Sequence, residues 1–257
     1  MIDRRRVSII GLKGQPYTAV DDELALDEPI CIFVNGEYHA TLIATPSMVE
    51  ELAAGFLFTE GVITSADDIR AMSVENDRVS VDLMREVDLR GASVGVMNLI
   101  VTACGSASRN VAPLEIPRIK SSLMVRADKV VGMFAELNRR STTHGATGGT
   151  HAAMICTPAG GVEAFAEDVG RHNAVDKAIG SMLLRKADPG GCVLITTGRL
   201  SGEMVQKAGQ AGIPVVASMT VPLVSGIRLA EATGQTLVAL SRGRLKVYVN
   251  EERIVAP

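Results

Sequence analysis

Aromatic residues are scarce in this sequence, which holds no tryptophan, three tyrosines and five phenylalanines among 257 residues. The core must therefore be built mainly from valine, leucine, isoleucine, alanine and methionine. No apolar run approaches the roughly 18 residues of a membrane-spanning helix, so we expect none to cross a bilayer. The opening MIDRRRVSII lacks the apolar stretch and the small-residue cleavage site of a signal peptide.

Positive charge is not in excess either, because the formal net charge is −3. This argues against a general nucleic-acid or membrane-surface binder. Only four cysteines are present, and they are far apart, unlike those of a secreted disulfide scaffold. We therefore expect a cytoplasmic chain with free thiols. Three cysteines lie in or beside apolar strands and are predicted to be core residues, namely Cys31, Cys156 and Cys192.

Two local patterns stand out in the first half of the chain. Asn35-Gly36 lies between apolar runs, and both residues tolerate the positive φ of a two-residue hairpin turn. A helix is then predicted to start with Thr45 as its cap and Pro46 in its first turn, and to end at Gly61.

A boundary between two unlike halves is predicted at PLEIPRIKS (113–121), where two prolines and a change of charge occur. We expect a smaller N-terminal α+β domain over residues 1–118 and a second domain over 119–257. In the second half, strands alternate with helices, which predicts an α/β fold with a parallel or mixed sheet and helices on its faces. The expected helices are 127–140, 172–186, 201–210 and 224–233, and the expected strands are 151–157, 162–169, 192–197, 214–218, TLVAL and LKVYV.

The remaining cysteine, Cys104, lies in the small-residue run VTACGSASRN (101–110). Small neighbours let backbone amides approach the sulfur, which lowers a thiol pKa and favours the nucleophilic thiolate. Arg109 could add to that effect. Composition alone leaves two alternatives, a functional thiol and a small residue in a turn.

Glycine-rich basic loops carry the second signal, because glycine-opened backbone beside an arginine, a histidine or a helix start suits phosphate. Two loops fall at the carboxyl ends of predicted strands, where ligands bind in such sheets, namely TTGRLS after CVLITT and ASMTVP after PVVAS. None matches a P-loop or a well-placed dinucleotide fingerprint, and ordinary turns are the alternative. The candidate phosphate ligands are Arg171, Arg199 and Arg244, and His144, His151 and His172 lie in the same loops.

A zinc deaminase is a further alternative for this half of the chain. That chemistry needs a histidine followed two residues later by glutamate, together with a P-C-x-x-C pair. Here His151-Ala152-Ala153 has no glutamate, and no such cysteine pair follows. The sequence therefore excludes zinc-deaminase chemistry, although the fold could still be related.

Several long motifs, in order, resemble the formate dehydrogenase accessory sulfurtransferases, the FdhD family. The resemblance runs from about residue 28 to 250. The motifs are ELAAGFLFTEG (51–61), TGGTHAA (147–153), EDVGRHNAVDKAIG (167–180), TTGRLSGEMVQKAGQAGIPVVAS (196–218) and AEATGQTLVALSRG (230–243).

The resemblance implies a sulfur carrier between a cysteine desulfurase and the molybdenum cofactor of formate dehydrogenase, and a homodimer. It implies a three-layer C-terminal domain with a mixed sheet, similar to cytidine deaminases but without zinc. It places the carrier thiol at Cys104 and the guanine-dinucleotide form of the cofactor at 240–245. The full predicted cofactor-binding set is Gly170, Arg171, His172, Thr197, Gly198, Arg199, Leu240, Ser241, Arg242, Gly243, Arg244 and Leu245.

One position departs from the family pattern. Most relatives carry C-x-x-C in the cysteine loop, whereas this chain has Ala107 in place of the second cysteine. A local two-thiol mechanism is therefore not available. A one-thiol persulfide mechanism through Cys104 remains, because exchange at sulfur needs one nucleophile and one leaving thiolate. The alternative is a chaperone that binds the cofactor without transferring sulfur.

Overall fold

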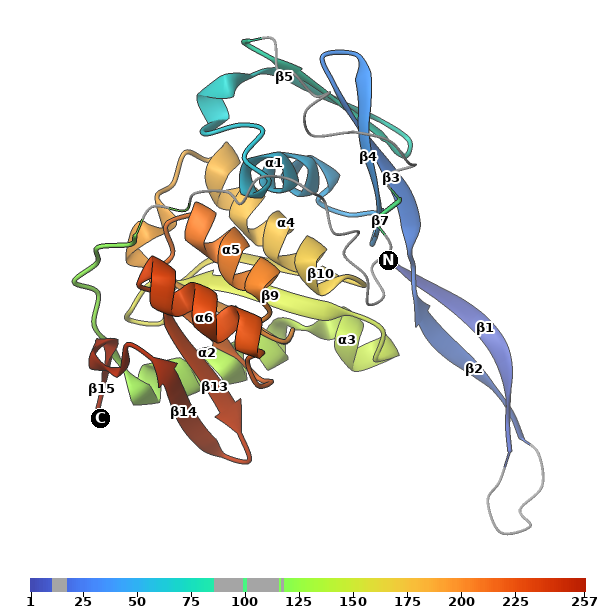
Figure 1. Cartoon of the computed structure of the whole chain (residues 1–257). Coiled ribbons are helices and arrows are strands. Elements are labelled where there is room, and N and C mark those ends of the chain that lie inside the picture. Colours follow the sequence, from blue (N-terminus) through green and yellow to red (C-terminus); the bar gives the residue numbers. More distant parts are fainter. Residues whose placement is uncertain (11–17, 86–98, 101–115, 117) are drawn as a thin grey trace.

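The structure, a computed structural model, describes residues 1–10, 18–85, 99–100, 116 and 118–257 (Figure 1). Cys104 lies outside these residues, as do residues 113–115 and 117 of the predicted boundary at 113–121. Within the described part, no helix is both long and apolar enough to cross a membrane.

A two-stranded ribbon forms the N-terminus and projects from the body of the molecule (Figure 1). It pairs β1 (Ile2–Ile9) with β2 (Thr18–Ala25) in antiparallel register. Arg4 faces Glu23 across the pair, and this ion pair joins the strands at 2.8 Å. The sequence patterns considered above did not predict this element, because its strands are charged and carry no apolar face.

A five-stranded sheet follows, and its central hairpin is the one expected at Asn35-Gly36. The two residues have φ of 50° and 82°, as a tight hairpin turn requires. Helix α1 (Val49–Thr59) packs on this sheet through Leu52 and Phe56. In spatial order the strands are β5 (Ile69–Glu75), β6 (Arg78–Leu83), β3 (Glu28–Val34), β4 (Glu37–Ala44) and β7 (Leu99–Ile100).

The predicted start of α1 is wrong. The helix begins at Val49, and its N-cap is Met48 in a left-handed conformation with φ 51° and no side-chain cap bond. Thr45 does not cap the helix, because its hydroxyl accepts a bond from the backbone N–H of Val169, far along the chain. A tertiary contact has taken the place of the local one.

A six-stranded mixed sheet forms the second half, as predicted. Strands β11, β12 and β13 run parallel, and the other three pair antiparallel to their neighbours. In spatial order the strands are β10 (Val162–Asp168), β9 (His151–Cys156), β11 (Val193–Thr196), β12 (Val215–Ser218), β13 (Thr236–Ser241) and β14 (Arg244–Val249).

Helices cover both faces of this sheet, which gives three layers (Figure 1). One face packs against α4, α5 and α6, and the other packs against α2. Each helix lies within two residues of its predicted range, and the short α3 was not predicted. Their bounds are α2 (Ala127–Arg140), α3 (Thr142–Thr147), α4 (Arg171–Leu184), α5 (Gly202–Gln210) and α6 (Val224–Thr233).

Smaller elements complete the described chain. Strand β8 (Val125–Arg126) pairs with β15 (Ile254–Val255) in parallel. The short 3-10 helices are η1 (Ala66–Asp68), η2 (Pro189–Gly191) and η3 (Glu251–Arg253).

Helices α1 and α4 join the two halves through a glycine contact. Gly55 of α1 and Gly180 of α4 face each other so closely that a Cβ on either would overlap the backbone of the other helix. Only glycine permits this approach. The division at residue 118 stays a prediction, because the two halves share this buried interface.

Candidate functional site

One edge of the six-stranded sheet collects the ends of its three parallel strands. Thr196 of β11, Ser218 of β12 and Ala239 of β13 lie in register across the sheet. The chain therefore leaves β11 and β12 side by side, at Thr197 and at Met219. In sheets of this kind, ligands bind outside the carboxyl ends of the parallel strands.

The antiparallel strands bring further residues to the same edge. Thr196 pairs with Ala153, so the start of β9 at His151 lies there, and His151 pairs with Asp168 at the end of β10. The turn into α4, with Arg171 at its first helical position, begins at the same edge. At about 4.8 Å per strand, the distance from β10 to β14 is about 24 Å. We call this the carboxyl edge.

The structure places all twelve predicted cofactor-binding residues along the carboxyl edge. Gly170, Arg171 and His172 form the turn into α4, and 197–199 follow β11. Residues 240–245 form the tip of the β13–β14 hairpin, and these two strands lie two and three positions from β11. Three separate stretches of sequence therefore share one continuous border of the sheet.

The turn into α4 is held by the buried carboxylate of Asp168. Its Oδ1 accepts bonds from the Gly170 backbone N–H at 2.7 Å and from Asn173 Nδ2 at 3.0 Å. Its Oδ2 accepts from the Thr45 N–H at 3.1 Å and pairs with Lys177 Nζ at 2.5 Å. Four donors thus converge on one carboxylate just before Arg171.

His151 is held neutral beside the same turn. Burial lowers the pKa of its imidazole, and the positive charge of Arg171 adds to that effect. Its Nδ1 lies 3.1 Å from Thr197 Oγ1, and the Thr197 hydroxyl accepts the Ala152 backbone N–H at 3.0 Å. The interior part of the edge therefore combines arginine charge with an uncharged imidazole.

Buried polar atoms at the carboxyl edge lack a hydrogen-bond partner among the described residues. They include Arg171 Nε and the hydroxyl of Ser201, which precedes α5. The predicted helix cap at Ser201 is correct in position, but the hydroxyl makes no cap bond. Buried donors of this kind normally find a partner, and an anionic group at two helix N-termini would supply one.

The hairpin tip at the far end of the edge is open to solvent. Arg242 and Gly243 adopt φ of 52° and 70°, which matches a tight two-residue turn. Arg244 is exposed at the start of β14, and its side chain is free to reach an anion along the border. This end therefore differs from the buried end near Arg171.

Two of the described cysteines, Cys156 and Cys192, are poor nucleophiles. Burial raises the pKa of Cys156 to about 12 and also raises the pKa of Cys192. Both are confirmed as core residues. Cys31 is half-buried in β3, with its sulfur 3.4 Å from Thr41 Oγ1. The predicted carrier Cys104 lies outside the described residues.

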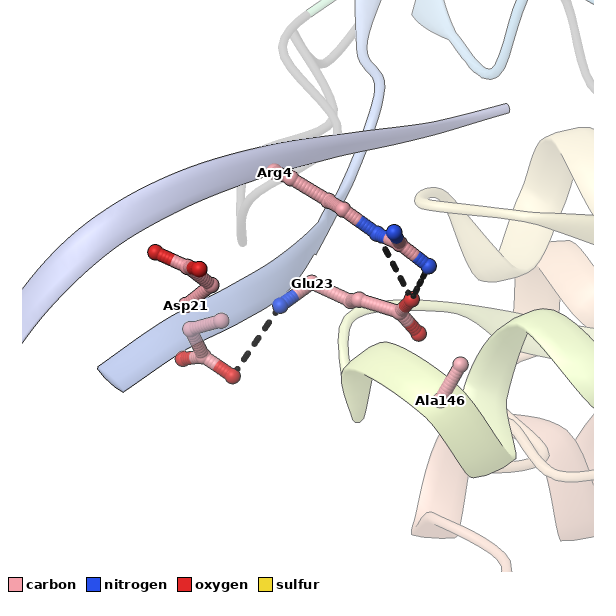
Figure 2. A pocket seen from close by; sticks show the side chains of 5 residues that line it. Arg4, Asp21, Glu23 and Ala146 are labelled. Atoms are coloured by element: carbon pink, nitrogen blue, oxygen red, sulfur yellow. Dashed lines mark hydrogen bonds and ion pairs between the residues drawn. The ribbon is translucent and has the colours of Figure 1, made fainter.

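A cavity of about 530 Å³ lies between the N-terminal ribbon and α3 (Figure 2), and none of the twelve predicted cofactor-binding residues lines it. Its walls are Arg4, Asp21, Asp22, Glu23 and Ala146. The guanidinium of Arg4 is already bonded to Glu23, so acidic groups dominate. Such a cavity repels an anion and does not suit a pyrophosphate. Among the described residues, no group of three or more histidine, cysteine or acidic side chains could hold a metal.

Sequence reasoning missed the buried ion pair behind the site. Lys177 and Asp168 are both fully buried, and Lys177 also donates to the Thr45 carbonyl at 2.8 Å. The available signal was a lysine on the apolar side of the helix HNAVDKAIG, where a charge needs a partner. The partner came from the preceding strand, and no local pattern identifies it.

Comparison with known proteins assigns this chain to a family. The FdhD/NarQ family model matches residues 25–255. Sulfur carrier proteins FdhD of Thermoplasma acidophilum and Geobacillus kaustophilus are 35% and 32% identical to this chain, covering 95% and 98% of it and 91% and 97% of their own lengths. A crystal structure from Desulfotalea psychrophila, assigned as a formate dehydrogenase accessory protein, is 30% identical. It superposes with a TM-score of 0.79 over 99% of both chains. This chain therefore belongs to the FdhD/NarQ family.

Proposed function

We propose that this protein is a sulfur carrier that serves the maturation of formate dehydrogenase. Cys104 takes sulfur from a cysteine desulfurase and passes it to a molybdenum cofactor in its bis-guanine-dinucleotide form, held as cargo at the carboxyl edge. The observation that carries the proposal is the single sheet edge that unites three predicted binding segments. Relatives of similar length bear the name sulfur carrier protein FdhD.

The carboxyl edge suits a long anionic cargo. Its breadth of about 24 Å accommodates a ligand with several separate phosphate groups. The unpartnered Arg171 Nε and the N-termini of α4 and α5 offer donors at one end, and Arg244 offers a guanidinium at the other. Fork-shaped guanidinium groups bind phosphate in a bidentate manner.

Chain direction supports a carrier thiol near this edge. Strand β7 ends at Ile100, which pairs in parallel with Leu42 of β4, and β4 leads on to Thr45. Thr45 is bonded directly to Asp168 at the carboxyl edge. Cys104 comes four positions after Ile100 in the sequence, and four residues of extended chain span at most about 14 Å.

The transfer step needs one thiolate. The Cys104 thiolate attacks the terminal sulfur of the donor persulfide, the donor S–S bond breaks, and the donor cysteine leaves as a thiolate. Release of that sulfur as sulfide would consume two electrons. Because Ala107 replaces the second cysteine, those electrons must come from a thiol reductant outside this loop.

Intact-protein mass spectrometry tests the proposal. The wild type is incubated with a cysteine desulfurase and cysteine, and Cys104→Ala is treated in parallel. We expect an adduct of one sulfur atom on the wild type and none on the variant. No adduct on the wild type, with an active desulfurase, would contradict sulfur transfer and leave an escort that binds the cofactor. In that case Cys104→Ala would still support formate dehydrogenase activity.

The proposal also includes a cytoplasmic location and a homodimer. The family resemblance implies the homodimer. Light scattering coupled to size exclusion measures the mass directly, and a monomer at working concentration would contradict it.

A further inference from the structure

We propose that Asp168 is a positioning residue, which fixes the turn into α4 so that the carboxyl edge presents its donors to the guanine-nucleotide end of the cargo. This inference rests on the proposed function and adds a residue that touches no ligand. It starts from the four donors that converge on the Asp168 carboxylate, two from the turn and two from elsewhere.

The carboxylate links local and distant parts of the chain. Through Oδ1 it holds Gly170 and Asn173, which flank Arg171 and His172. Through Oδ2 it holds Thr45 and Lys177. Asn173 also donates to the Ile43 carbonyl at 2.8 Å, so both ends of the turn are tied to the end of β4.

Only a carboxylate satisfies this arrangement. All four neighbours donate, and an asparagine in the same place has one acceptor oxygen and one amide group that donates. The side chains of Asp168 and Lys177 are both 0% exposed, so water cannot replace a lost bond. Binding residues held within a fraction of an ångström need such support from behind.

A second buried ion cluster in the same helix provides a matched control. Lys207 of α5 pairs with Asp176 of α4 at 3.0 Å, and both side chains are at most 8% exposed. Lys207 also bonds to Thr59 of α1. The side chains of Asp176 and Lys207 bond to each other, to Thr59 and to Glu60, and these bonds do not involve residues 168–173, yet the burial of the pair is comparable. Its removal should cost stability without disturbing the turn.

The test measures guanosine diphosphate affinity by calorimetry on four variants. We expect Asp168→Asn with Lys177→Met to weaken binding about tenfold or more, since about 1.4 kcal/mol of lost positioning is a factor of ten. The control pair, Asp176→Asn with Lys207→Met, should stay within about twofold of wild type even where denaturant unfolding shows a similar loss of stability.

A milder pair keeps the inference testable if the first double variant does not fold. Thr45→Val removes the hydroxyl that accepts the Val169 N–H, whereas Thr45→Ser keeps it. We expect about threefold weaker binding for Thr45→Val and wild-type binding for Thr45→Ser, because the Val169 N–H loses its acceptor in the first variant only, and the turn is then held less firmly. Hydrogen exchange at the Gly170 amide should accelerate in Thr45→Val only.

The outcomes separate this inference from the proposed function. Sulfur loading of Cys104 should be unchanged in every variant, since loading does not involve the turn. Wild-type affinity in the Asp168 double variant, or an equal loss in the Asp176 control, would overturn the positioning role. Failure of the wild type to bind guanosine diphosphate would instead contradict the proposed cargo.

Discussion

Helix α4 carries two buried ion clusters that differ in what they hold. The Asp168–Lys177 pair joins the end of β10 to α4 and bonds the backbone of the turn that leads into the helix. The Asp176–Lys207 pair uses the residue of α4 next to Lys177, and it bonds Thr59 of α1 and Glu60, the C-cap of α1. The first cluster positions the turn at the carboxyl edge, and the second joins helices α1, α4 and α5.

The comparison shows how similar burial can serve different ends. Burial raises the pKa of Asp168 and lowers the pKa of Lys177, and the contact between the two groups acts against both shifts. In the second cluster, burial opposes the charge on Lys207, but two carboxylates outweigh it and raise the pKa. Removing one partner of such a cluster leaves the other charge buried and unpaired, which costs unfolding free energy.

The largest effect is expected from Lys207→Met. This change leaves the Asp176 carboxylate buried without its cation, which typically costs about 3–5 kcal/mol of unfolding free energy. Adding Asp176→Asn removes the stranded charge and should restore more than half of the loss. Urea unfolding of both variants measures the difference. Equal losses of unfolding free energy in the single and double variants would show that the Asp176–Lys207 ion pair does not stabilise the packing of the helices.

A smaller loss is expected at the glycine contact between α1 and α4. In Gly180→Ala the new Cβ overlaps the Glu51 carbonyl, so α1 and α4 must separate. We expect a loss of about 1–3 kcal/mol, as for other overpacked sites. Gly132→Ala in α2 is the matched control, because its Cβ would meet open space. That variant should gain about 0.5–1 kcal/mol from helix propensity. Parallel thermal unfolding of the two distinguishes collision from propensity.

Elements that obey a local rule were predictable in both halves of the chain. The Asn35-Gly36 turn and the stop of α6 at Gly234, with φ 75°, need only their own residues. The contacts of Thr45 were not predictable. Its partners Asp168 and Val169 lie more than 120 residues away, and nothing in the local sequence favours them over a helix cap.

The candidate site also has parts that the local sequence predicts and parts that depend on distant residues. Glycine and arginine content identified the three segments of the carboxyl edge, because phosphate chemistry leaves a compositional signal. Their alignment on one border comes from strand register, which no segment encodes alone. The support behind the turn, Asp168 with Lys177, remained hidden because a buried charge is recognised only when its partner is known.

The smallest effect is expected from His151, an ionisable residue at the carboxyl edge. Burial holds the pKa of its imidazole below the usual value of 6.5, so the unfolded chain takes up a proton more readily than the folded one. Stability should therefore fall as the pH drops below about 6.5, with the slope set by the extra proton bound on unfolding. In His151→Gln, which keeps a polar group near Thr197, this part of the slope should vanish. Urea unfolding of wild type and variant between pH 7.5 and 5 measures it, and parallel curves would show that the folded state does not hold this imidazole neutral. If the unfolding free energies of wild type and His151→Gln differ in their pH dependence only in this range, the titrating group lies at the carboxyl edge. The two ion clusters, whose charged groups have partners, would then not account for this part of the pH dependence.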